Sequence, residues 1–169
     1  MNAGMRNGAA LLVVLAAASA PGCGGAGYYG EIELPDLVVT ILSPRLALAP
    51  GESTTITVRV QNNGTGAATA PLIQIPGPIG FRYDSVTCLS AGAVFCPAVS
   101  VPMMAGGIIY PSIPSHTELA FTFTGVAIGD VGSRISIAAT ARLDGDREQG
   151  NNAALLVIPV VAAPASTAP

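Results

Sequence analysis

The chain has 169 residues, a formal net charge of -3 and only 10% charged residues. All seven of its basic residues are arginines, and they are scattered along the sequence, so the chain lacks the clustered basic face that nucleic-acid binding needs. The absence of lysine also excludes Schiff-base chemistry, a Ser–Lys dyad and the lysine of a phosphate-binding loop. We therefore expect a protein that is not an enzyme, needs no cofactor and binds no nucleic acid.

Residues 1–22 have the pattern of a secretory signal peptide. Arg6 precedes an apolar run over 9–20, and small residues follow it up to Cys23. At about 12 residues this run is shorter than the roughly 20 that cross a hydrocarbon core. A cysteine just past such an exit resembles the acceptor position of bacterial lipoprotein precursors. The resemblance implies a lipid anchor at Cys23, which would hold the protein on a membrane through its acyl chains.

Two other outcomes stay open for this N-terminal region. Cleavage after Ala18 would release a periplasmic or secreted protein, and an uncleaved segment would stay in the membrane as an anchor. In each case the chain is exported. Residues 23–33 are rich in glycine and predict a tether, and 162–169 predict a flexible tail.

Residues 34–161 predict one β-domain. Isoleucine and valine alternate with polar residues over 54–61, which is the period of a half-buried strand. The expected strands cover 37–42, 54–61, 70–75, 81–88, 118–125, 134–143 and 153–160. Turn residues separate them, and no segment has the apolar stripe of a helix. Because parallel strands need crossover helices, we expect an all-β fold, an antiparallel β-sandwich of about seven strands.

Two cysteines remain if Cys23 carries lipid. Cys88 and Cys96 lie eight positions apart, and an exported chain reaches an oxidising compartment. We expect these two cysteines to form a disulfide. The alternative is a pair of reduced thiols.

Several turn and strand motifs occur in a characteristic order. They are the segments 35–40, 49–52, 54–58, 61–68, 144–146 and 151–154. In this order they resemble the Ig-like conserved-repeat domain of bacterial surface proteins (the domain of unknown function numbered eleven), and they are similar to the bacterial cell-adhesion-related domain. The resemblance covers nearly all of 34–161. It implies an Ig-like sandwich at the bacterial surface that serves adhesion or another structural interaction.

One apolar segment, 101–111, is a candidate partner-binding site. It carries Met103, Met104, Ile108 and Tyr110 around two glycines. Methionine-rich surfaces adapt to partners, and large exposed apolar patches often mark interaction sites. The favoured interpretation is that the segment folds back over an open end of the sandwich, and the partner contact is the competing hypothesis.

An acidic loop is a weak candidate for calcium. Asp144, Asp146 and Glu148 alternate like the start of an EF-hand loop. However, Gln149 stands where the sixth-position glycine is required, and Leu155 stands where the bidentate glutamate is required. A solvated turn is therefore the better interpretation, and we expect no metal here.

A glycan-binding module is the other alternative function. Such modules present aromatic platforms, but the chain has no Trp, and only Tyr83 and Tyr110 are left as candidate exposed rings. The only histidine, His116, is expected at the surface on a strand or in the loop before it. We therefore predict a non-catalytic module of the cell envelope, anchored by lipid, with an unidentified envelope protein as its partner.

Overall fold

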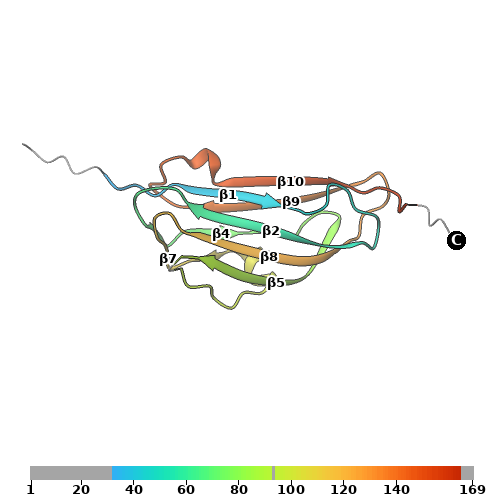
Figure 1. The fold of residues 1–169 in the computed structure, drawn as a ribbon, viewed down its shortest axis with the longest axis horizontal. Coiled ribbons are helices and arrows are strands. Elements are labelled where there is room, and N and C mark those ends of the chain that lie inside the picture. Colours follow the sequence, from blue (N-terminus) through green and yellow to red (C-terminus); the bar gives the residue numbers. More distant parts are fainter. Residues whose placement is uncertain (1–31, 93, 165–169) are drawn as a thin grey trace, which may run out of the picture. The chain divides into compact units, whose positions relative to one another are not determined.

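The computed structural model describes residues 32–92 and 94–164, which form a two-layer β-sandwich (Figure 1). The first sheet has the strand order β1–β2–β8–β5, with β1 (Leu37–Leu42), β2 (Ser53–Asn62), β8 (Glu118–Ala127) and β5 (Phe81–Ala91). The second has the order β10–β9–β4–β6, with β10 (Ala153–Pro159), β9 (Arg134–Arg142), β4 (Leu72–Gln74) and β6 (Ile108–Ile109). All strand pairs within these sheets are antiparallel. The predicted all-β sandwich is confirmed, and each of the seven expected strands is present.

The strand alternation builds the core. On β2, Ile56, Val58 and Val60 are fully buried, while the residues between them reach the surface or its margin. The facing side chains of the other strands complete the cluster, among them Leu119, Phe121 and Phe123 on β8 and Ile135, Ile137, Ala139 and Ala141 on β9. A period of two along each strand thus directs one set of side chains between the two sheets.

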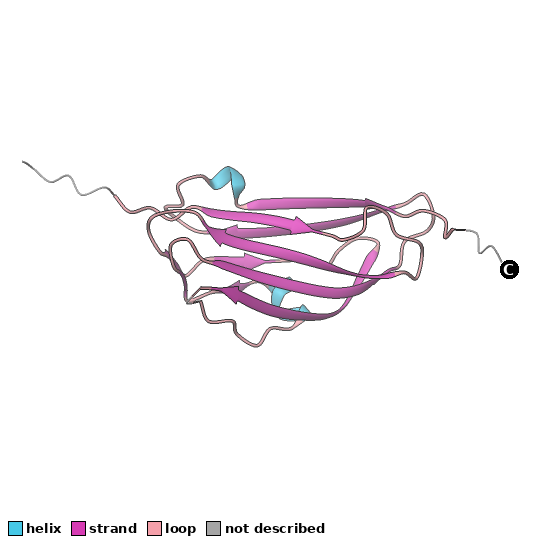
Figure 2. Cartoon of the chain, viewed as in Figure 1, coloured by secondary structure: helices cyan, strands magenta, loops and turns pink. Residues whose placement is uncertain are grey.

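Several short elements were not predicted. They are β3 (Ala68–Thr69), β7 (Ser112–Ile113), the helix α1 (Val101–Gly106) and a 3-10 turn η1 (Gln149–Asn151) (Figure 2). None is long enough to show a period of its own. Helix α1 begins with Pro102 in its first turn, where the missing N–H is tolerated. No helix of the described residues is long and apolar enough to span a membrane.

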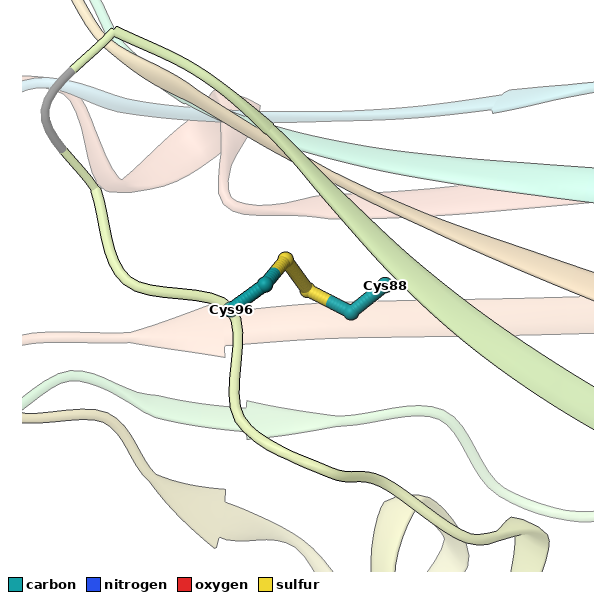
Figure 3. Close-up of a disulfide and its surroundings, with 2 residues drawn as sticks. All are labelled: Cys88 and Cys96. Atoms are coloured by element: carbon teal, nitrogen blue, oxygen red, sulfur yellow. A yellow bond between two sulfur atoms is a disulfide. The ribbon is translucent and has the colours of Figure 1, made fainter.

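The predicted disulfide is confirmed. Cys88 lies on β5 and Cys96 on the segment that follows it, with their Cα atoms 5.7 Å apart (Figure 3). Both cysteines are partly buried against the core. Closing so short a loop stabilises the fold by about 2.5 kcal/mol in the chain-entropy model. The bond fastens the segment after β5 to the edge of the first sheet.

Asn62, at the end of β2, connects three segments of the chain. Its Oδ1 accepts hydrogen bonds from the backbone N–H groups of Asp36 at 3.1 Å and Gly64 at 3.0 Å. Its Nδ2 donates to the carbonyl oxygens of Gly66 at 2.8 Å and Ile113 at 2.9 Å. The side chain is completely buried, and all four bonds go to backbone. Asn62 therefore fixes the entry to β1 and the turn after β2 together.

Candidate interaction surfaces

The apolar segment 101–111 packs against the sandwich through two buried side chains, while Met103 and Ile109 are exposed. Met104 and Tyr110 are buried in the core. Helix α1 packs against β4 and β5, and its backbone is tied to β4, since Ile75 N–H donates to the Met104 carbonyl at 2.9 Å and Gln74 Nε2 to the Ala105 carbonyl at 3.1 Å. The segment therefore folds back over the sandwich, as the favoured interpretation of the sequence predicts.

This placement corrects two of the four candidate anchors. The side chains of Met104 and Tyr110 are out of reach of a partner because the core surrounds them. Ile108 is half-buried on β6 and packs against the core, and Met103 is half-exposed on α1. Of the four predicted contact residues, Met103 is the most exposed, at 48%.

The acidic loop supports the backbone. Asp146 is buried, and its Oδ2 accepts the Leu37 N–H at 2.8 Å while its Oδ1 accepts the Glu148 N–H at 3.0 Å. The Glu148 Oε1 accepts the Gly150 N–H at 3.3 Å, and Asp144 is exposed. Within residues 32–92 and 94–164, no three His, Cys, Asp or Glu side chains are grouped so that they could hold a metal ion. The loop therefore secures the start of β1.

The tyrosine rings are not exposed, so the prediction of two surface rings for a glycan is wrong. Tyr83 points into the core, and its ring centroid lies 4.3 Å from that of Phe123. Tyr110 is also buried, and neither hydroxyl has a hydrogen-bond partner among residues 32–92 and 94–164. Burial raises the pKa of both phenols above the ordinary value of 10.0. His116 is exposed in the turn before β8, which confirms its predicted surface position.

The unpaired hydroxyl of Tyr83 leads to a stability prediction. Tyr83→Phe should leave the free energy of unfolding unchanged or raise it by about 1 kcal/mol at pH 7, because it removes a buried polar group that has no partner. The raised pKa means that the folded state keeps the phenol proton more tightly than the unfolded state does. Stability from this group is thus complete below about pH 10 and falls as the pH rises above it.

Urea unfolding of wild type and Tyr83→Phe between pH 7 and pH 11 checks this prediction. The variant should lose less stability above pH 10 than the wild type does. A loss of more than about 1 kcal/mol at pH 7 would mean that the hydroxyl makes a stabilising bond.

The end of the sandwich where β1 and β10 finish carries exposed aliphatic side chains. We call this surface the apolar end; it consists of Leu46, Ile79, Ile128 and Val131. Leu46 is 91% exposed and Ile79 is 72% exposed. They lie in the loops between β1 and β2, between β4 and β5, and between β8 and β9. The sequence does not reveal this surface, because its side chains come from three loops that are far apart in the chain.

Backbone hydrogen bonds hold these loops together. Ile128 N–H donates to the Gly80 carbonyl at 2.9 Å, and Gly132 N–H donates to the Val160 carbonyl at 2.8 Å. Beside them, Arg45 and Glu52 form an ion pair at 3.6 Å. Their loop and residues 161–164 line a groove of about 630 Å³. Backbone hydrogen bonds therefore hold the loops of the apolar end in place. The charged side chains Arg45 and Glu52 beside it form an ion pair with each other.

The chain enters the sandwich at the other end. The Leu34 carbonyl accepts the Gly66 N–H at 3.0 Å, and the Pro35 carbonyl accepts the Arg147 N–H at 2.8 Å, both beside the start of β1. A strand as long as β2 spans about 34 Å between the two ends. The described domain thus separates its N-terminal entry from the apolar end by the length of the sandwich.

Comparison with known proteins supports the fold. No protein-family model matches the chain, and no curated protein sequence matches it significantly. The crystal structure of a CARDB domain from Pyrococcus furiosus in complex with di-metal ions is similar, with a TM-score of 0.52 and 19% identity over 76% of this chain and 90% of that one. The solution NMR structure of that domain gives a TM-score of 0.53 and 18% identity over 78% and 100%. The chain therefore has the Ig-like sandwich fold of CARDB domains.

Proposed function

We propose that this protein is an exported, non-catalytic module of the bacterial cell envelope, anchored by lipid on Cys23. The observation that carries the proposal is the Cys88–Cys96 disulfide in an Ig-like sandwich, because such bonds persist in oxidising compartments outside the cytosol. Cys23 lies outside the described residues, and its position after a signal-like segment supports lipidation. Residues 1–22 would be the signal peptide, and 23–33 the tether.

The geometry supports a role in presenting a surface. A tether of about a dozen residues reaches up to about 40 Å when extended. It would join the sandwich at the end opposite Leu46 and Ile128, so the apolar end would be free to meet an envelope protein. Exposed apolar side chains that lie together on well-held loops often mark protein–protein interfaces. The resemblance to conserved-repeat and cell-adhesion-related domains supports adhesion as the type of contact.

The two alternatives have less support. The archaeal CARDB domain is described with di-metal ions. In this chain, the Asp146 carboxylate is occupied by two backbone N–H groups, and no metal-binding cluster occurs in the described ranges. Glycan binding through Tyr83 and Tyr110 is not available because both rings are buried. An envelope protein therefore remains the proposed partner.

Replacing Cys23 by serine tests the anchor. The wild-type chain should sediment with membranes and carry the added mass of acyl chains, whereas Cys23→Ser should lose both, because only a cysteine can accept the lipid. The double variant Cys88→Ser/Cys96→Ser is the control, and it should stay with the membrane. Unchanged membrane association and mass of Cys23→Ser would contradict lipid anchoring.

A photo-reactive residue at position 46 or 128 tests the proposed contact surface. In living cells it should crosslink to one envelope protein, which mass spectrometry identifies. The control is the same residue at position 89, because Leu89 is also exposed but lies on β5, away from the apolar end. Equal crosslinks from positions 46, 128 and 89 would mean that the apolar end is not a specific contact.

A further inference from the structure

Asn63 and Gly64 form an Asn-Gly pair, a sequence that is prone to spontaneous deamidation. In this reaction the backbone nitrogen of the glycine attacks the side-chain carbonyl carbon of the asparagine. Glycine permits the attack because it has no Cβ to hinder the approach. The sequence contains one other such pair, Asn7–Gly8, which lies outside the described residues. Asn63 is exposed in the turn after β2, so the amide that would react faces solvent.

The other reacting group, the Gly64 nitrogen, is protected by the fold. Gly64 is buried, and its N–H donates to the Asn62 Oδ1 at 3.0 Å. Before it can attack, this nitrogen has to lose its proton to a base in solution. A buried N–H that is held in a hydrogen bond loses its proton only after the structure around it has opened. The reactive amide is therefore exposed, while the nitrogen that would attack it is not.

Further contacts hold this turn closed against the segment 34–36. The Asn63 N–H donates to the Asp36 carbonyl at 2.7 Å. Gly64 lies so close to the segment that an added Cβ would overlap the Leu34 carbonyl oxygen. The pairing of β1 with β2 begins beside this contact (Figure 1). The turn therefore cannot open without separating from 34–36.

We propose that Asn63 is a latent deamidation site whose reaction is controlled by the hydrogen bond to Asn62. When the turn 62–66 opens, the Gly64 nitrogen loses its proton and attacks the Asn63 Cγ. The new N–C bond closes a five-membered succinimide ring, and the side-chain nitrogen leaves as ammonia. Water then opens the ring at one of its two carbonyl carbons, which gives aspartate or isoaspartate at position 63. Water is the only other reactant.

Isoaspartate at position 63 would not fit this turn. Its backbone runs through the side-chain Cβ, which adds a methylene to a link whose Cα atoms are normally about 3.80 Å apart. The N–H groups on the two sides of this link are bonded to Asp36 and to Asn62. Both bonds could not be kept, because Gly64 has no free space beside the segment 34–36. The reaction would therefore loosen, irreversibly, the place where the chain enters the sandwich, whether or not the N-terminal segment carries lipid.

Deamidation and hydrogen exchange of the wild-type chain should report the same opening. Mass spectrometry of the tryptic fragment 60–82 follows the reaction at Asn63 in mildly alkaline buffer, with urea below the unfolding transition to bring the rate into range. The folded chain should react at least tenfold more slowly than a synthetic peptide of residues 60–67. The slowing should equal the protection of the Gly64 amide against exchange within a factor of about three, because both processes need this N–H exposed. Deamidation as fast as in the peptide, or slowing that does not match the Gly64 protection, would overturn the proposal.

A matched pair of variants tests the control by Asn62. Asn62→Ala removes the acceptor of the Gly64 N–H, so its deamidation should be at least tenfold faster than that of the wild type. Ile137→Ala is the control, since Ile137 is fully buried on β9 and its truncation weakens the core without touching the turn. Equal acceleration in the two folded variants would mean that global unfolding controls the reaction, which contradicts the proposal. The wild-type comparison decides the question if Asn62→Ala does not fold.

The isoaspartate form, separated by chromatography from aged wild-type protein, tests the structural consequence. Its Asp36 and Gly66 amides, which bond across the turn contact, should exchange at least tenfold faster than in the unmodified chain. Asn63→Asp is the control, because it introduces the same carboxylate without the added methylene, and its exchange should remain that of the wild type. Unchanged protection of these two amides in the isoaspartate form would refute the loosening.

Discussion

Replacing Asn62 by alanine should lower the free energy of unfolding by about 3 kcal/mol or more, since a buried polar group left without its partner costs about 1–3 kcal/mol. The variant would remove the acceptor of the Asp36 and Gly64 N–H groups and the donor to the Gly66 and Ile113 carbonyls. Three of these four bonds are buried. In the variant, water would not reach the groups that lose these bonds, so they would stay unpaired and destabilise the fold. Urea unfolding followed by circular dichroism measures the loss.

Asn63→Ala is the matched control for this prediction. Asn63 is the next residue, its side chain is exposed, and its backbone N–H donates to the Asp36 carbonyl at 2.7 Å. The control should change stability by less than about 0.5 kcal/mol. Similar losses for the two variants would show that the turn sequence, and not the Asn62 side chain, holds these segments together.

Gly125→Ala should be at least as damaging, with a loss of about 3 kcal/mol or failure to fold, because overpacking a core forces backbone and side chains apart. Gly125 lies on β8 in the middle of the first sheet. A Cβ at this position would overlap the Arg82 carbonyl oxygen and would lie 2.5 Å from the Phe81 ring. The backbone of β5 would have to move to make room, since a carbonyl oxygen cannot turn aside as a flexible side chain can.

Gly77→Ala is the control for Gly125→Ala. Gly77 is exposed in the loop between β4 and β5, and an added Cβ there would meet no atom within 4 Å. Its substitution should be neutral, or should stabilise by up to about 1 kcal/mol by restricting the unfolded chain. Thermal unfolding of both variants compares them, and a wild-type melting temperature for Gly125→Ala would contradict the packing argument.

The sequence predicts the fold better than it predicts the candidate site. The sequence of segment 101–111 favours a loop folded back over the sandwich, but it does not show which of its side chains enter the core, because that depends on the gap that β4 and β5 leave for Met104. Sequence patterns report the local alternation of side chains and not the space between two sheets. In the same way, the sequence around Tyr83 does not show which face of β5 its side chain occupies. The pairing of β5 with β8 brings its ring beside Phe123.

By itself, the sequence determined the seven longer strands, the all-β class and the disulfide, because these follow from local alternation, turn residues and the short spacing of Cys88 and Cys96. The tertiary structure alone decided what lies at the surface. It buried Met104 and Tyr110 and brought Leu46 and Ile128 to one end. The physical reason is that exposure depends on the order of strands in the sheets, which is set by contacts between residues far apart in the chain.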